Sequence, residues 1–171
     1  MKAKDLFERW HLPVFRYLRR LTGDRVLAEE LCQDVFTRVV QSLERYQPAG
    51  REQAWVFSIA LNVFRNQRRD HARRLQPEPM PANELAGSGH NLALALDLDQ
   101  ALARLPESDR ESFLLREMGG LGYAEISDLL DVTPDAVRSR IHRARKALRE
   151  ELKPVARRSY PRMVTEGNPH E

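Results

Sequence analysis

A cluster of arginine, serine and histidine side chains around residue 140 has the chemistry needed to contact DNA. Four apolar residues recur there at helical spacing, namely Val137, Ile141, Ala144 and Leu148. At about 100° per residue, the opposite face of that helix gathers Arg138, Ser139, His142, Arg143, Lys146 and Arg149. Arginine can donate two hydrogen bonds to one guanine, and further cations can pair with phosphates. The spacing therefore predicts a DNA-reading face, with a merely solvated basic face as the alternative.

A helix-turn-helix would position these side chains. Residues 124–130 fit a short apolar helix, and Asp131-Val132-Thr133-Pro134 fits a tight turn. In that turn Thr133 can cap the next helix and Pro134 can occupy its first position. Two helices, a short turn and a basic second helix over about residues 123–142 are typical of the helix-turn-helix motif. Ser139 and His142, placed between arginines, favour base contacts over a plain solvated face.

Charge is strongly segregated along the 171 residues, although the formal net charge is only +3. Five arginines between Arg65 and Arg74, opposed by Asp70, give +4. Residues 75–100 contain no Lys or Arg and sum to −4, while residues 138–162 sum to +8. Two basic blocks separated by an acidic spacer fit a polyanion held at two places.

The apolar pattern predicts an all-α chain of two small helical domains joined by a flexible linker. Helical spacing covers most of residues 1–75, with an interruption at Pro13, a stop at Thr22-Gly23-Asp24 and a loop near residues 46–50. Residues 76–91 are rich in Pro and Gly and read as the linker. Residues 92–153 form the second domain, starting with a Leu/Ala-rich helix that Asn91 could cap and that Pro106 ends. The basic tail, residues 154–171, is expected to be disordered.

Several classes of protein are disfavoured by the composition. Cys32 is the single cysteine, which excludes an internal disulfide and favours a reducing cytoplasm. No stretch approaches the roughly 18 apolar residues of a membrane span. No nucleotide-binding, metalloprotease or hydrolase motif appears, and the histidines are scattered singly. We therefore expect no catalytic residues, no metal and no cofactor, and give little weight to an enzyme with an appended DNA-binding domain.

Two segments resemble one protein family. Residues 101–152, ALARLPESDRESFLLREMGGLGYAEISDLLDVTPDAVRSRIHRARKALREEL, are similar to the promoter-reading domain, sigma region 4, of extracytoplasmic-function (ECF) sigma factors of bacterial RNA polymerase. DRVLAEELCQDVF, residues 24–36, and AWVFSIALN, residues 54–62, are similar to the first domain of that family, sigma region 2. The resemblance covers about three quarters of the chain, in the expected order.

The resemblance implies a role for three sets of residues. In the first domain, contacts to core polymerase fall to Glu30, Gln33, Asp34 and Arg38. Contacts to the −10 promoter element fall to Tyr46, Asn62, Arg65, Arg68, Arg69 and Arg73. In the second domain, contacts to the −35 element fall to Arg138, Ser139, His142, Arg143 and Lys146. His142 stands where relatives often carry an aromatic residue, and Trp55 is favoured as a core residue over a base-stacking one.

By this resemblance the chain is an alternative sigma factor that binds core RNA polymerase and directs initiation at its own promoters. The implied partners are core polymerase, promoter DNA and an anti-sigma factor, soluble or membrane-bound, with no small-molecule substrate. The expected location is the cytoplasm, or the inner membrane when an anti-sigma factor holds the chain there. A helix-turn-helix regulator that is not a polymerase subunit is the main alternative, but it assigns no function to the ridge from Glu29 to Leu43 or to Asn62 and the arginines that follow it.

Overall fold

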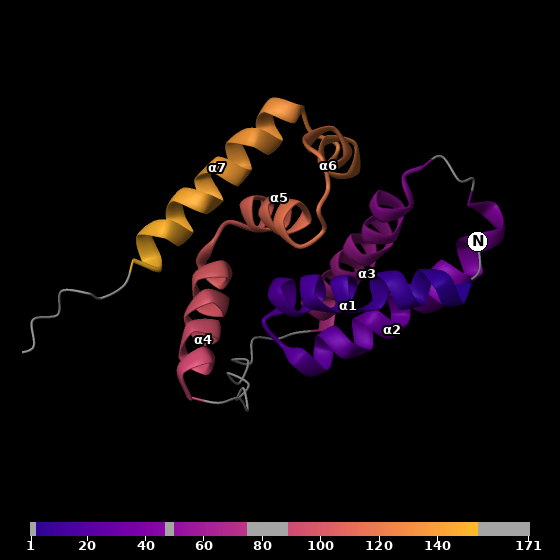
Figure 1. The fold of residues 1–171 in the computed structure, drawn as a ribbon, viewed down its shortest axis with the longest axis horizontal. Helices are drawn as coiled ribbons and strands as arrows, with labels where there is room; N and C mark the ends of the chain where they lie inside the picture. Colours follow the sequence, from indigo (N-terminus) through magenta and orange to yellow (C-terminus); the bar gives the residue numbers. More distant parts are fainter. Residues whose placement is uncertain (1–2, 47–49, 75–88, 154–171) are drawn as a thin grey trace, which may run out of the picture.

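The computed structural model describes residues 3–46, 50–74 and 89–153, and it is helical with no strand in these ranges. The helices are α1 (Ala3–Thr22), α2 (Arg25–Ser42), α3 (Glu52–Arg74), α4 (Gly89–Arg104), α5 (Glu107–Glu117), α6 (Tyr123–Leu130) and α7 (Pro134–Glu151), with a 3-10 turn η1 (Leu43–Arg45). They form two groups, α1–α3 and α4–α7, that lie against each other (Figure 1). The predicted all-α class is confirmed.

Helices α1, α2 and α3 pack side by side around one apolar core (Figure 1). Gly23 makes the turn after α1 with φ of 72°, a left-handed conformation that glycine adopts without strain. The Asp24 carboxylate then caps α2 by accepting the backbone N–H of Val26 at 2.9 Å. Cys32 is buried between these helices, and burial raises the pKa of its thiol to about 11, so the thiol stays protonated at neutral pH.

Helix α1 continues through Pro13, where the sequence pattern predicts an interruption. Proline has no N–H, so this position cannot donate to the carbonyl of Arg9. The helix persists because tertiary packing anchors it on both sides of the proline. Leu6 lies before Pro13 and Val14 and Leu18 lie after it, and each of these side chains is at most 1% exposed. Packing of the apolar face outweighs the lost hydrogen bond.

The second group contains the predicted helix-turn-helix, formed by α6 and α7. Asp131 ends α6 in the left-handed region with φ of 53°, a conformation that aspartate tolerates better than most residues. The Thr133 hydroxyl accepts the Ala136 N–H at 3.1 Å, and Pro134 is the first residue of α7, as predicted. Val137 and Ile141, at most 1% exposed, fix α7 against α5 and α6.

The predicted linker ends earlier than the sequence suggests. Helix α4 begins at Gly89, so residues 89–91, assigned to the linker, are helical, and Asn91 lies inside the helix instead of capping it. The strong helix formers that follow extend the helix towards its N-terminus, where the first N–H groups need no intrahelical partner. The rest of the linker and the tail, residues 154–171, lie outside the described residues, as does most of the predicted loop at residues 46–50.

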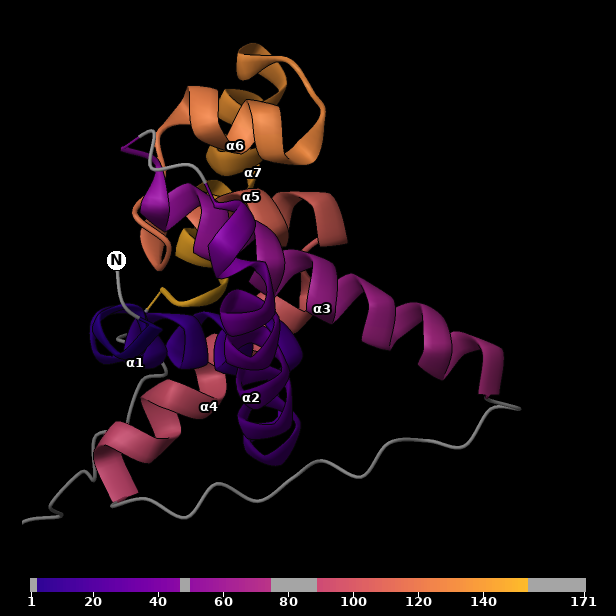
Figure 2. The ribbon, with the colours of Figure 1, turned by 90° about the vertical axis from the view of Figure 1, so that its right-hand side faces the viewer.

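The two groups touch along one seam, in which α1 contacts α4 and α5, and α3 contacts α6. The C-terminal half of α3 extends beyond the bundle (Figure 2). None of the described helices is both long and apolar enough to cross a bilayer.

At the seam Tyr17 is fully buried, and its hydroxyl has no hydrogen-bond partner among the described residues. Burial, followed by the nearby Glu111 carboxylate, raises the pKa of this hydroxyl. The ring itself packs edge-on against Phe57, with 5.3 Å between centroids. The phenol is therefore a packing group whose oxygen contributes no stability.

We expect Tyr17→Phe to leave the free energy of unfolding unchanged or to raise it by about 1 kcal/mol, because a buried unpaired hydroxyl is removed. Unfolded tyrosine ionises at its ordinary pKa of 10.0, whereas the folded group stays neutral to higher pH. Above that pH the wild type should lose stability relative to the variant by about 1.4 kcal/mol per pH unit. Urea denaturation across the alkaline range measures this difference. Tyr123→Phe is the control, and parallel curves for wild type and Tyr17→Phe would contradict the assignment.

Candidate nucleic-acid and polymerase interfaces

Helix α7 presents the side chains predicted to read DNA. Arg138, Ser139, His142, Arg143 and Lys146 are all exposed, and we call this set the α7 recognition face. The opposite stripe, from Val137 to Leu148, is buried. Arg138 also donates to Asp135 at 2.6 Å and lies over the Tyr123 ring, with 5.5 Å from its guanidinium carbon to the ring centroid. These contacts orient a guanidinium at the start of α7.

Arg143 is held by a carboxylate that the sequence analysis did not single out. Its Nε and Nη2 donate to the two oxygens of Asp109 at 2.9 and 2.7 Å. The Asp109 side chain is 4% exposed while that of Arg143 is 58% exposed. The hydrogen bonds and the charge of Asp109 raise the pKa of Arg143. The ion pair occupies one edge of the guanidinium and leaves the Nη1–Nη2 edge as a donor pair for a base or phosphate.

The middle of α3 carries the residues predicted for the −10 element. We call Asn62, Arg65, Arg68, Arg69 and Arg73 the α3 arginine face. With Asn66 and Ala72, most of these line a hollow of about 570 Å³ whose remaining wall is Glu107 of α5. Asn62, Arg69 and Arg73 are exposed, and Arg69 donates to the Asn66 side-chain oxygen. The amide and the arginines therefore share one concave surface.

Two arginines of the α3 arginine face are engaged by the second group of helices. Arg65 donates through Nε and Nη2 to the Glu111 carboxylate at 3.1 and 2.7 Å, and this hydrogen bonding raises the pKa of Arg65. Arg68 forms an ion pair with Glu107. The sequence pattern predicts that both arginines contact DNA. The structure brings them to carboxylates more than 35 positions away, a pairing that periodicity along the chain cannot reveal.

Tyr46 and Trp55 form a stacked aromatic pair at the start of α3. Their ring centroids are 4.2 Å apart with 26° between the planes. Trp55 is partly buried against the core of the first group, in agreement with the prediction that it packs there. Tyr46 is half-buried, and one face of its ring is covered by Trp55.

Helix α2 exposes the polar ridge that the sequence predicts. Glu30, Gln33, Asp34 and Arg38 are all exposed, and we call them the α2 ridge. Leu31, Val35 and Val39, on the opposite side of the helix, are buried. Across the described ranges, no three His, Cys, Asp or Glu side chains are arranged to hold a metal ion. The ridge is thus an exposed polar surface on a helix whose opposite side is buried.

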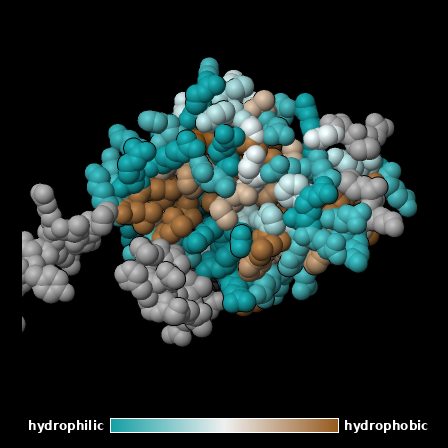
Figure 3. Space-filling view, in the orientation of Figure 1, coloured by the Kyte–Doolittle hydropathy of each residue, from teal (hydrophilic) through white to brown (hydrophobic). Residues whose placement is uncertain are grey.

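A further apolar surface lies between α4, α5 and the end of α7. Leu98, Phe113, Leu148 and Leu152 line a groove of about 500 Å³, and Arg145, Arg149 and Lys153 border it. Figure 3 shows apolar surface gathered between α4 and α7. No pattern along the sequence reveals this groove, because its apolar residues come from three separate helices.

Fold and surfaces together define a two-module helical protein whose second module is a helix-turn-helix. Comparison with known proteins is consistent in both modules: Sigma-70 region 2 matches residues 6–74, and Sigma-70, region 4 matches residues 95–148. The ECF RNA polymerase sigma factor SigE of Mycolicibacterium smegmatis is 36% identical over 161 residues, which cover 89% of this chain and 62% of SigE. The chain thus spans less than two thirds of SigE.

The RNA polymerase sigma factor CarQ of Myxococcus xanthus is 33% identical over 153 residues, covering 87% of this chain and 88% of CarQ. Among solved structures, the sigma factor RpoE in complex with the anti-sigma factor NepR from Bartonella quintana has a TM-score of 0.72 at 24% identity, covering 88% of this chain and 98% of that chain. The chain belongs to the ECF family of RNA polymerase sigma factors.

Proposed function

We propose that this protein binds core RNA polymerase and directs it to a specific set of promoters. The observation that carries this proposal is that one chain holds both sigma-type modules, each with an exposed polar face on a buried apolar stripe. The module of residues 1–75 would supply core and −10 contacts, and the module of residues 92–153 would supply −35 contacts. Residues 76–91 would link them, with the tail at 154–171 outside both.

Each face suits its proposed target chemically. The α2 ridge offers carboxylate, amide and guanidinium groups for a protein partner. The α3 arginine face offers cations for phosphates and one amide, Asn62, that can both donate to and accept from the edge of a base lifted from the melted strand. The α7 recognition face would enter a major groove. The protein itself would perform no covalent chemistry and would work in the cytoplasm, where polymerase acts.

An anti-sigma factor is the further partner we propose. RpoE, one of the structural neighbours, was solved in complex with the anti-sigma factor NepR. In this chain the groove between α4, α5 and α7 has an apolar floor and a basic border. Such a surface suits an amphipathic helix with acidic flanks, which an anti-sigma factor could supply, whether soluble or held at the inner membrane.

In vitro transcription with purified core polymerase on a promoter library tests the proposed function. Promoter-specific transcripts that depend on the added chain are expected. If the chain instead fails to bind core polymerase and binds promoter duplex strongly alone, it acts as a helix-turn-helix regulator and the proposal is lost.

Asp34→Ala is expected to weaken core binding at least fivefold, or about 1 kcal/mol, because an exposed interface carboxylate is removed from the α2 ridge. Titration of labelled protein with core polymerase measures the affinity. Glu150→Ala, which removes the same charge from an exposed site at the end of α7, is the matched control and should bind like wild type. Equal affinities for Asp34→Ala and the control would argue against the ridge as a core contact.

A further inference from the structure

The DNA-facing arginines of the first module lie against carboxylates of the second. Glu107 and Glu111 lie one helical turn apart at the start of α5, and we call them the α5 acidic edge. Glu111 accepts both hydrogen bonds of the Arg65 fork, and Glu107 pairs with Arg68 at the wall of the hollow beside Asn62. The α5 acidic edge thus occupies the surface assigned to DNA.

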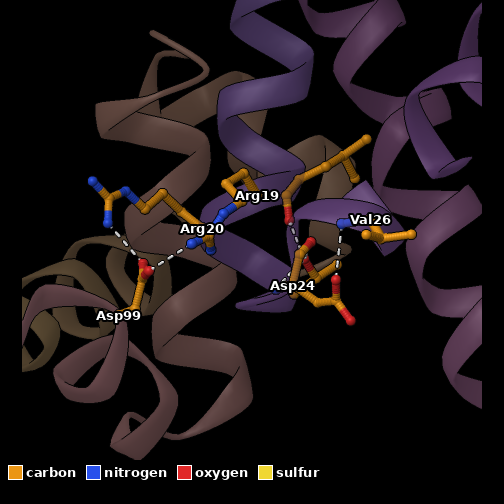
Figure 4. A network of polar contacts seen from close by, with 7 residues as sticks. Arg19, Arg20, Asp24, Val26 and Asp99 are labelled. Carbon is orange, nitrogen blue, oxygen red and sulfur yellow. Dashed lines mark hydrogen bonds and ion pairs between the residues drawn. The ribbon is translucent and has the colours of Figure 1, made fainter. Parts of the chain in front are cut away.

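A second ion cluster fastens the same seam at another place. Asp99 of α4 accepts from Arg19 at 3.0 Å and from Arg20 at 2.7 Å, both at the end of α1. Figure 4 shows both arginines directed at Asp99, beside the Asp24 cap of α2. The Asp99 side chain is 11% exposed, so this cluster is shielded from solvent ions.

A third set of contacts joins the start of α3 to the turn around α6. The Gln53 side-chain amide donates to the Gly119 carbonyl, and Arg51 lies 3.6 Å from the Asp128 carboxylate. All three sets of contacts are polar. These polar contacts surround the buried Tyr17 ring, and water can replace ion pairs and an amide contact when the modules separate.

The α5 acidic edge neutralises a cluster of arginines at the seam. Arg65, Arg68 and Arg110 lie together there, and burial, followed by the charge of Arg68, lowers the pKa of Arg110. Glu107 and Glu111 oppose this positive charge. A phosphate can replace them on the α3 arginine face, because a guanidinium fork donates to carboxylate and phosphate oxygens with the same geometry.

We propose that the α5 acidic edge is an intramolecular ligand of the α3 arginine face that competes with single-stranded DNA for Arg65 and Arg68. This inference rests on the proposed −10 role of that face. In the free chain Arg65 and Arg68 are closed to DNA, and the second module must leave the first before these two arginines can hold the melted strand. Any partner that holds the modules apart therefore activates DNA binding, and any partner that holds them together prevents it.

The test uses the full chain without polymerase and two variants that loosen the seam. Glu107→Gln/Glu111→Gln neutralises the α5 acidic edge with side chains of the same shape. Asp99→Asn breaks the separate Arg19 and Arg20 cluster and leaves α3 and α5 unchanged. Anisotropy of a fluorescent 20-nucleotide single strand of mixed sequence gives the Kd, and small-angle X-ray scattering gives the radius of gyration.

Both variants are expected to have a larger radius of gyration and to bind the single strand about tenfold more tightly. A tenfold gain corresponds to a wild type in which about one-tenth of the molecules are in the open, binding-competent form. Glu117→Gln/Glu150→Gln is the matched control. It removes two charges, one of them the Arg145 partner within the second module, and touches none of the seam contacts described. The control should keep the wild-type Kd and radius.

Variants that stay compact, or that expand without gaining affinity, would overturn the inference, as would an equal gain in the control. Asp99→Asn keeps the test decisive if the double glutamine variant does not fold. Failure of the proposed function gives a different result. In that case the wild-type chain would yield no promoter-specific transcripts with core polymerase, whether its two modules are closed or apart.

Discussion

Replacing Arg143 with alanine is expected to lower transcription from the protein's own promoters by about 5- to 150-fold, the range of a lost bidentate base contact worth about 1–3 kcal/mol. Arg143 is exposed on the α7 recognition face, and Asp109 fixes its guanidinium by two hydrogen bonds. A donor pair held in place loses little conformational freedom when it meets DNA. In vitro transcription with core polymerase measures the loss, and core affinity should be unchanged.

The same substitution leaves the buried Asp109 carboxylate without its arginine, so a fall in stability could imitate a loss of DNA contact. Arg143→Ala/Asp109→Asn separates the two effects, because a neutral amide at position 109 tolerates the missing partner. We expect the double variant to regain thermal stability while transcription stays low. Recovery of transcription together with stability would show that Arg143 serves only to neutralise Asp109.

Sequence reasoning succeeded where structure is encoded by neighbours along the chain. Thr133 and Pro134 start α7 as predicted, because capping depends on residues within one turn. The apolar stripe of α7 is buried because a period of 3.6 residues selects one face of a helix. Pro13 is the exception. Proline is expected to interrupt a helix, but α1 continues through it because apolar side chains on either side pack into the core.

Sequence reasoning failed where partners are distant in the chain. Asp109 and Glu111 read as ordinary polar residues of α5, yet both are buried, each against an arginine of a different helix. Their burial follows from the way α5 lies between α3 and α7, and no periodicity within α5 encodes that placement. The consequence is functional, because the arginines of two predicted DNA-binding faces are held by carboxylates of a single helix.

Replacing Asn62 with alanine is expected to lower promoter-dependent transcription by about 5- to 150-fold and to weaken the preference for one base in the −10 element. Asn62 is exposed beside the arginines of the 570 Å³ hollow, so its amide can meet a base while the cations hold the backbone. Transcription on promoters that carry each of the four bases at every −10 position measures both effects. Loss of a base contact should lower the transcript yield most on the preferred promoter. The yields from promoters with the other three bases should then lie closer to that of the preferred one.

Asn66→Ala is the matched control, because Asn66 lines the same hollow one helical turn further on and accepts a hydrogen bond from Arg69. It should keep the base preference and lower the yield on all promoters alike, if at all. Asn62→Asp removes only the donor half of the amide, so it should penalise bases that need a donor and repel the strand through its charge. An Asn62→Ala variant that loses activity uniformly, with its base preference intact, would place Asn62 among the backbone contacts and assign base reading to another residue of the hollow.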